Sequence, residues 1–347
     1  MQFGASSGST DAGSTANSSS GTSSVNFVFH EPDEVETFAR GAGSVLKSTL
    51  LTAGSYRLEM TETRLVTLRV RRSSLSLPRL NYYAFPATLT AVVFDLDACQ
   101  APAMINGEET SAATVMVAPS GSTLFSRTSA GLASGSVFLP PERLAESARA
   151  LLGHELPELA TCRLVRPHPD KLQRLRHLHQ AACQLAETVP DVLAQSEVAR
   201  GIEEKLCRAV VECLTGDEPG LSTIAFRDRT SVMRRLEHAL EAHRDQPLYL
   251  TELCAEVGVS ARTLRLHCQE HFGMSPQRYL WLRRMNMARR DLARADSTQS
   301  TVTAIAVEHG FWELGRFSVQ YRRLFGESPS ETLRRPADEP RPIAMSL

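Results

Sequence analysis

The sequence predicts an α+β protein in which a β-rich amino-terminal part is followed by helices. Short runs rich in Val, Leu, Thr and Phe, separated by turn residues, fill the region from Val25 to about Pro140. Beyond Pro141, apolar residues instead recur at spacings of three and four, which is typical of amphipathic helices. Breaker residues divide this helical part at Pro190 and at 215–220. The 347 residues are therefore expected to form two or three domains.

Residues 1–24 are almost wholly Gly, Ser, Thr, Ala and Asn. Such a segment buries too little apolar surface to offset the entropy of ordering. We expect a disordered low-complexity tail, part of which could be a tag or linker.

Residues 25–153 are expected to form the β-rich domain. The runs 64–70, 89–94 and 114–117 are predicted strands, the first because charged or hydroxyl residues alternate with aliphatic ones. Asn106-Gly107 is the best hairpin turn. Many short strands of this kind indicate a small barrel or sandwich.

Three helices are predicted next, over 141–153, 171–189 and 192–214. The last two are separated by Pro190 and form an antiparallel hairpin within a 154–214 unit. Their apolar stripes are suited either to an intramolecular core or to a dimer seam. Residues 215–227 are a predicted linker, 228–335 an all-helical domain and 336–347 a disordered tail.

Charge is unevenly distributed between these parts. Residues 221–335 contain 18 arginines and no lysine against 13 acidic residues, a net charge of +5, which leaves −6 for the rest of a chain whose total is −1. This segregation favours a polyanionic partner for the basic part, although a solvated face is the alternative.

The seven cysteines form no C-x-x-C pair, and their odd number cannot be fully paired within one chain. They indicate a reducing compartment. No run approaches the length of a membrane span, and the first residues lack the features of a signal peptide. We expect a soluble, cytoplasmic protein with no membrane contact.

The helical domain contains the helix-turn-helix pattern twice. In the first unit, helix 250–257 is followed by the turn Gly258-Val259-Ser260 and by a second helix from Ala261, with Leu264 inward and Arg262 and Arg265 outward. In the second unit, helix 302–309 is followed by Gly310-Phe311 and a second helix from Leu314, with Phe317 and Tyr321 inward. A helix over 276–292 joins the units, with Met287 among its buried residues and Arg283, Arg284, Arg289 and Arg290 available to solvent or to a DNA backbone.

These residues match a known pattern. The match runs through Val259-Ser260, Arg262-Thr263-Leu264, Phe272-Gly273-Met274-Ser275-Pro276, Ala288-Arg289, Ile305-Ala306, Gly310-Phe311, Phe317-Ser318, Tyr321-Arg322 and Phe325-Gly326-Glu327-Ser328-Pro329-Ser330. Over about 228–335 the chain resembles the AraC/XylS family of bacterial transcription regulators. The resemblance implies a seven-helix DNA-binding domain whose two helix-turn-helix units read adjacent major grooves of double-stranded promoter DNA.

Carried over by position, the family's base-reading residues are Arg262, Arg265, Leu266, Leu314, Gly315, Arg316, Ser318 and Val319. The residues expected to contact DNA phosphates are Ser260, Arg283, Arg284, Arg322 and Arg323. The chain departs from the family pattern at Cys268, where a buried Phe is usual, at Leu333, near a usual Tyr, and in the apolar opening of the second recognition helix. Gly315 costs that helix about 1 kcal/mol relative to Ala, which suggests looser DNA binding by this unit.

The amino-terminal part is similar to the family only in layout, and most like the branch that includes ethanolamine-utilisation regulators. The resemblance implies a cupin-like barrel that binds a small-molecule effector, helices that form a homodimer, and contact with RNA polymerase. The resemblance identifies neither the effector nor the residues that bind it. A pocket lined by Arg57, Arg69, Tyr82 and Tyr83 is conceivable, but the sequence does not assign these residues to it. A constitutive DNA-binding protein, whose barrel is purely structural or only dimerises, is the alternative.

A metalloenzyme of the cupin type is the remaining rival, because such barrels hold a divalent metal on two or three imidazoles. Through residue 153 the only histidine is His30, so we expect no metal, no cofactor and no enzymatic activity. His267 and His271 have a spacing that suits zinc, but a structural role is favoured. His177 and His179 are expected to be solvated, and Asp95 and Asp97 to stabilise a turn. The lack of an aromatic-rich strand motif argues against RNA binding.

Overall fold

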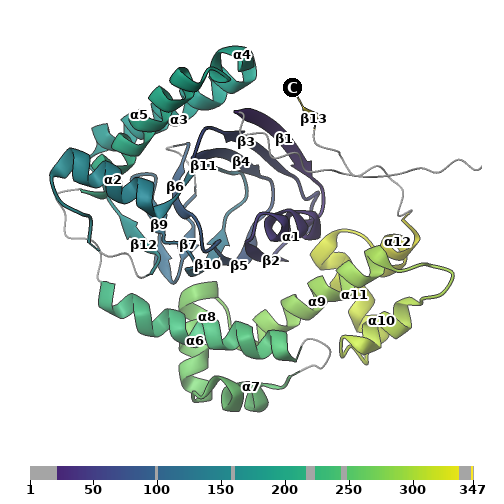
Figure 1. Cartoon of the computed structure of the whole chain (residues 1–347). Coiled ribbons are helices and arrows are strands. Elements are labelled where there is room, and N and C mark those ends of the chain that lie inside the picture. Colours follow the sequence, from purple (N-terminus) through teal and green to yellow (C-terminus); the bar gives the residue numbers. More distant parts are fainter. Residues whose placement is uncertain are drawn as a thin grey trace, which may run out of the picture.

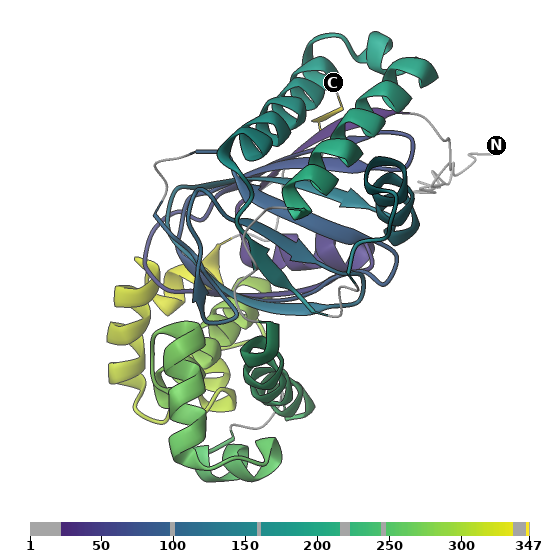
Figure 2. The same cartoon turned by 90° about the vertical axis from the view of Figure 1, so that its left-hand side faces the viewer.

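A computed structural model describes residues 22–97, 101–157, 161–215, 223–243, 248–335 and 345–346. It confirms the α+β class: a β-rich domain lies between a helical hairpin on one side and a helical domain on the other (Figures 1 and 2).

The strands form two sheets rather than one continuous barrel. The larger sheet has the order β12-β9-β6-β11-β4-β3-β1-β13, and the smaller has the order β2-β5-β10-β7-β8. All strand pairs are antiparallel. The bounds are β1 (Ser23–Phe29), β2 (Val45–Leu50), β3 (Leu58–Arg64), β4 (Arg69–Leu75), β5 (Arg79–Ala84), β6 (Thr90–Asp95), β7 (Met104–Ile105), β8 (Glu108–Glu109), β9 (Val115–Ala118), β10 (Thr123–Thr128), β11 (Leu132–Leu139), β12 (Arg163–Val165) and β13 (Met345–Ser346).

The helices predicted over 141–153, 171–189, 192–214, 250–257, 276–292 and 302–309 correspond to observed helices, whose bounds differ by four residues or fewer. The described helices are α1 (Pro32–Gly41), α2 (Pro141–Leu152), α3 (Pro169–Thr188), α4 (Pro190–Leu193), α5 (Ser196–Leu214), α6 (Thr223–Ala242), α7 (Leu250–Val257), α8 (Ala261–Phe272), α9 (Pro276–Arg294), α10 (Val302–Glu308), α11 (Leu314–Phe325) and α12 (Pro329–Arg334). Helix α6 begins inside the stretch expected to be a linker.

Two of the three predicted strands are confirmed, as β6 and β9. The Asn106-Gly107 turn is confirmed as well, because both residues have positive φ between β7 and β8.

The predicted strand 64–70 is wrong. Arg64 ends β3 and pairs with Arg69, the first residue of β4, so the segment is a hairpin turn. Leu65 and Leu68 are buried in this turn, and Glu203 of α5 accepts the backbone N–H of Leu68 at 2.7 Å. The alternation of apolar and polar residues therefore comes from a turn packed against α5. A half-buried strand would show the same alternation, so the sequence pattern alone does not distinguish the two.

Helix α1 was not expected in the β-rich region. Pro32 occupies its first turn, and Glu34 accepts the backbone N–H of Glu31 as part of a capping box. Val35 and Ala39, four residues apart, are buried, so the helix has an apolar stripe too short to be separated from the neighbouring strands by periodicity alone.

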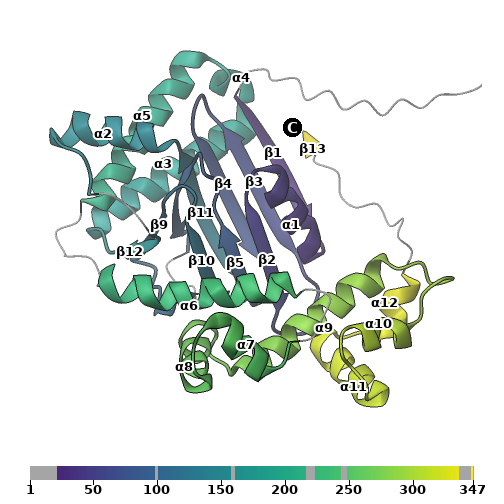
Figure 3. The same cartoon turned by 60° about the horizontal axis from the view of Figure 1, so that its bottom comes forward.

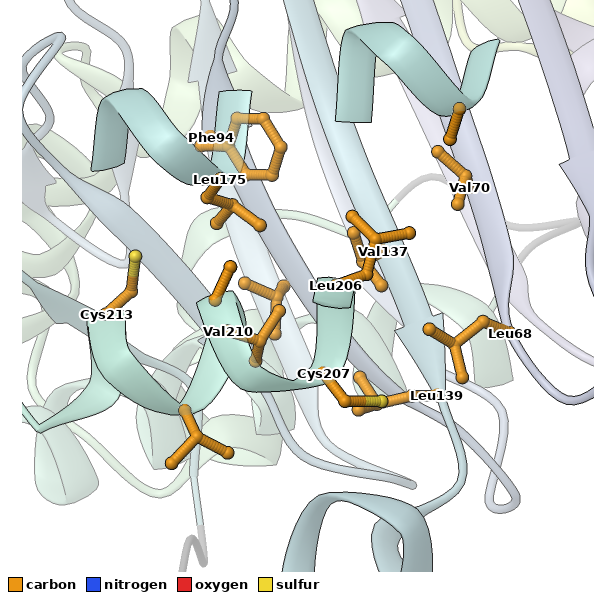
Figure 4. Close-up of a cluster of buried hydrophobic side chains, with 14 of the residues drawn as sticks. Leu68, Val70, Phe94, Val137, Leu139, Leu175, Leu206, Cys207, Val210 and Cys213 are labelled. Carbon is orange, nitrogen blue, oxygen red and sulfur yellow. The ribbon is translucent and has the colours of Figure 1, made fainter. Parts of the chain in front are cut away.

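The hairpin of α3 and α5 covers the larger sheet. Its apolar stripes contribute Leu175, Leu206 and Val210, which pack with Val137 and Leu139 of β11 (Figure 4). Of the two uses open to these stripes, the structure therefore assigns them to the intramolecular core.

His179 on α3 is buried, so the prediction that it is solvated is wrong, whereas His177 is exposed. The His179 Nε2–H donates to the carbonyl of Arg71 at 3.0 Å, and its ring lies edge-on to Phe94. Burial lowers the pKa of His179 from 6.5 to about 4, although the hydrogen bond to Arg71 opposes the shift.

This histidine should make folding pH-dependent. Between pH 6.5 and about 4 the unfolded chain binds a proton at His179 and the folded chain does not, so the free energy of unfolding should fall as the pH falls through this window, by on the order of 3 kcal/mol. His179→Gln retains a hydrogen-bond donor but does not titrate. Urea unfolding at pH 7.5 and 4.5 should show a smaller loss of stability in this variant than in the wild type; equal losses would contradict the assignment.

The helical domain packs directly on the β-rich domain. Leu282 and Met285 of α9 share an apolar cluster with Leu46, Tyr56 and Leu58. Asn286 pairs with the backbone of Leu50 on the edge strand β2, because its Oδ1 accepts the Leu50 N–H at 2.9 Å and its Nδ2 donates to the Leu50 carbonyl at 3.2 Å.

Each predicted disordered tail contains residues that form a strand in the structure. Strand β1 begins at Ser23, within the expected amino-terminal tail, and Met345–Ser346 pair with β1. The rest of both tails, residues 1–21, 336–344 and 347, lies outside the described residues, as does most of the predicted linker. Within the described parts of the chain, no helix combines the length and apolar character needed to cross a bilayer.

Candidate nucleic-acid interface

The first helix-turn-helix unit consists of α7 and α8. Gly258 ends α7 with φ 69°, a conformation that glycine adopts without strain, and the Ser260 hydroxyl caps α8 by accepting the Thr263 N–H at 3.1 Å. Leu264 is fully buried, which fixes α8 against the domain. Arg262 and Arg265 consequently lie on the exposed face, one turn apart. Leu266 beside them is 56 % exposed, unusual for a leucine.

The second unit consists of α10 and α11. Phe311, Phe317 and Tyr321 pack as a chain of rings, with centroids 4.9 and 5.6 Å apart. This packing leaves Arg316 and Val319 exposed on the outer face of α11, together with Gly315. Leu314 and Ser318 are half-buried, and the Ser318 hydroxyl donates to the Leu314 carbonyl at 3.0 Å.

Helix α9 joins the two units. Its 19 residues correspond to about 28 Å at 1.5 Å per residue. Figure 3 shows α7 and α8 at one end of α9 and α10 and α11 at the other, on the side of the molecule away from α3 and α5. This length is comparable to the ~34 Å between successive turns of the major groove.

The residues predicted to contact phosphates fall into two groups. Ser260, Arg322 and Arg323 are exposed near the recognition helices. Arg284 is half-buried, with its guanidinium 5.6 Å from the centre of the Phe311 ring.

Arg283 does not lie on the surface, in disagreement with the prediction. Its Nη1 donates to Glu237 Oε2 at 2.9 Å, and the side chains of Arg283 and Glu237 are 13 % and 2 % exposed. Tyr279 also donates its hydroxyl to Glu237. This buried group joins α6 to α9 and supports the fold of the domain.

Three further arginines of α9 pair with acidic residues in and beside α1 of the β-rich domain. Arg289 Nη2 donates to Glu31 Oε1 at 2.8 Å, and Arg290 Nη2 donates to Glu36 Oε1 at 3.0 Å. Arg294 pairs with Asp33 at 2.7 Å. Part of the positive charge of the helical domain is therefore neutralised by α1.

Met287 of α9, which was predicted to be buried, is only half-buried. Met285 is the buried methionine of this helix.

The histidines of α8 lie beside the β-rich domain. His271 is buried, and its ring lies edge-on to Phe125 of β10. The ligand atoms of His267, Glu270 and His271 lie within 4.8 Å of one another; the spacing of the two histidines suited zinc, and Glu270 was not predicted to join them. The Nδ1 atom of His267 lies 3.6 Å from Oε2 of Glu270.

A cavity of about 230 Å³ lies inside the β-rich domain. Of the conceivable pocket residues, Tyr83 lines it, whereas Arg57, Arg69 and Tyr82 do not; the arginines on its wall are Arg71 and Arg79. Asp95 also faces the cavity, and burial raises its pKa to about 6. The expected turn role for Asp95 therefore does not describe its side chain. The sequence did not reveal this wall because it depends on the register of both sheets.

Comparison with known proteins bears on the helical domain. Residues 253–335 match a family model described as a helix-turn-helix domain. A probable thc operon regulatory protein of Rhodococcus erythropolis is 45 % identical over 103 residues, which are 30 % of this chain and 31 % of that protein. The XylDLEGF operon transcriptional activator 3 of Pseudomonas putida is 31 % identical over 115 residues, 33 % of this chain and 35 % of that protein.

The match thus spans about a third of the length of these relatives. A crystal structure of the AraC-like transcriptional activator CuxR aligns with 77 % of this chain and 96 % of its own, at 15 % identity and a TM-score of 0.40, which is too distant to support an argument about the β-rich domain. The two helix-turn-helix units, their pattern of buried and exposed residues and the matches to the helix-turn-helix family model and to the Rhodococcus and Pseudomonas regulators agree. The carboxyl-terminal domain of this chain is therefore an AraC/XylS-type helix-turn-helix domain.

Proposed function

We propose that this protein is a sequence-specific transcription regulator that binds promoter DNA through α8 and α11. The observation that carries the proposal is the exposure of Arg262, Arg265 and Arg316 on two helices held at the ends of α9. Arginine recognises guanine through its O6 and N7 atoms, the commonest specific contact in the major groove. Ser260, Arg322 and Arg323 would position the helices on the phosphates.

The β-rich domain is proposed to bind a small-molecule effector. The cavity supports this role, because ligand sites in proteins are enclosed, largely apolar spaces with a few polar groups. Homodimer formation and contact with RNA polymerase follow from the family resemblance and belong to the same proposal. The proposed cytoplasmic location follows from the cysteines, which indicate a reducing compartment. We infer that the protein acts by binding and not as an enzyme.

A constitutive DNA-binding protein is the second candidate. In that case the β-rich domain would only support the helical domain, and the contacts of Asn286 with Leu50 would be purely structural. The presence of the cavity favours the effector-binding alternative.

Selection of genomic DNA tests the proposal. The purified full chain is mixed with sheared bacterial genomic DNA, with and without a small-molecule extract of the same cells, and the retained fragments are sequenced. Enrichment of a few promoter fragments is the expected result, and their retention should change with the extract. Uniform, salt-sensitive retention of all fragments would instead indicate nonspecific binding.

A further inference from the structure

The cavity of the β-rich domain contains a buried cation whose charge is not neutralised by another residue. Arg79 on β5 is 9 % exposed, and its Nη1 donates to the neutral hydroxyl of Tyr56 at 2.5 Å. The Nε of Arg79 is buried and makes no hydrogen bond within the described part of the chain. No carboxylate among the described residues forms an ion pair with Arg79.

A buried charge is costly unless it is paired, so an arginine in this position indicates a missing anion. Arg71, the other arginine of the cavity wall, shows the usual arrangement. Its Nη2 donates to Glu62 Oε2 at 2.6 Å, and its guanidinium lies 4.8 Å from the centre of the Phe138 ring.

Asp95 is the acidic residue of the cavity wall, and it does not serve as the partner of Arg79. The arginine that influences the Asp95 carboxylate is Arg176, which also donates to the Asp95 backbone carbonyl at 2.8 Å. Asp95 therefore interacts with Arg176, and no ion pair joins it to Arg79 among the described residues.

The rest of the wall combines apolar side chains with eight hydroxyl-bearing residues and Asn81. Its side chains include Leu46, Leu58, Met60, Phe85 and Leu124. A volume of about 230 Å³ equals about eight water molecules in the liquid, which suits an organic compound of about eight to ten non-hydrogen atoms.

We propose that this cavity binds a small organic monoanion, whose carboxylate pairs with the Arg79 guanidinium and whose apolar body fills the space between the two sheets. The inference deepens the proposed function, because it names the chemical class of the effector. Arginine binds a carboxylate through two parallel N–H groups, and the buried Nε supplies one that no residue uses.

The position of Arg79 gives such a ligand access to the domain interface. Tyr56, which contacts Arg79, belongs to the same apolar cluster as Leu282 and Met285 of α9. An anion at Arg79 competes with Tyr56 for the guanidinium and therefore acts on a residue that supports the helix joining both DNA-binding units.

Ligand binding to the full chain tests the inference. The probes are hexanoate, cyclohexanecarboxylate and phenylacetate, each compared with its neutral amide in thermal unfolding and calorimetry. We expect at least one carboxylate to raise the melting temperature by about 5 °C at saturation. Its amide should bind about 10- to 100-fold more weakly, because a hydrogen bond to a charged group is lost.

Arg79→Gln should abolish the preference for the carboxylate while leaving the chain folded, because the variant removes an unpaired buried charge. Arg57→Gln is the matched control, since Arg57 is exposed and lies outside the cavity wall. Equal binding of acid and amide, unchanged binding by Arg79→Gln, or no stabilisation by any of the three acids would overturn the inference.

These outcomes are separable from failure of the proposed function. If genomic DNA selection yields promoter fragments but no carboxylate binds, the regulator stands and the monoanion does not. If a carboxylate binds through Arg79 but DNA is retained uniformly, the ligand site stands and the sequence-specific regulator does not.

Discussion

Arg283→Leu is expected to destabilise the helical domain by about 3–5 kcal/mol. The variant would leave the carboxylate of Glu237, which is 2 % exposed, without its cation, and removal of one partner of a buried pair is far more costly than the net value of the pair. Trp281 and Trp312 are the two tryptophans of the chain and both lie in this domain. Tryptophan fluorescence during urea unfolding therefore measures the effect.

The double variant Glu237→Leu with Arg283→Leu is the control. It replaces both charges by apolar groups, so it should recover most of the lost stability. Folding of Arg283→Leu with wild-type stability, combined with a smaller salt dependence of DNA binding, would restore the role in phosphate contact that the sequence suggested.

The helical domain could be predicted because its signals are local. Within seven residues of the sequence, Gly258 ends α7, Ser260 caps α8 and Leu264 is buried against the domain. At this spacing, each of these residue types indicates one structural role. The same applies to Asn106-Gly107, where two residues define a turn.

The arginines of α9 could not be assigned in this way. Arg283, Arg289 and Arg290 follow the same helical pattern as the exposed arginines. Arg283 pairs with Glu237, 46 residues earlier in the sequence, and Arg289 and Arg290 pair with Glu31 and Glu36, more than 250 residues away. A basic face of a helix therefore predicts a polyanion only when no acidic helix packs against it.

The β-rich domain was predicted at the level of class and not of detail. Leu65 and Leu68 are apolar because a turn is buried beneath α5, and this depends on Glu203 in a helix that follows more than 130 residues later. The identity of the cavity wall likewise requires the pairing of β5 with β2 and β10, which no local pattern specifies.

Arg262→Ala and Arg265→Ala are each expected to weaken binding to the specific DNA site by about 1–3 kcal/mol, or roughly 5- to 150-fold. Both guanidinium groups are exposed, and neither forms an ion pair with another described residue, so the substitutions remove a base contact without leaving a buried partner. Their unfolding curves should match the wild type. Affinities for a selected promoter fragment and for a scrambled fragment of the same composition, measured at several salt concentrations, give the result.

Arg322→Ala separates base reading from attraction to the DNA backbone. Arg322 is exposed at the far end of α11, so this variant should weaken binding to both fragments about equally and reduce the slope of log affinity against log salt by about one. The two variants in α8 should instead reduce the ratio between the specific and scrambled fragments. If they lower both affinities equally and leave this ratio intact, α8 holds the domain on the phosphates and sequence recognition must lie with Arg316 and Val319 of α11.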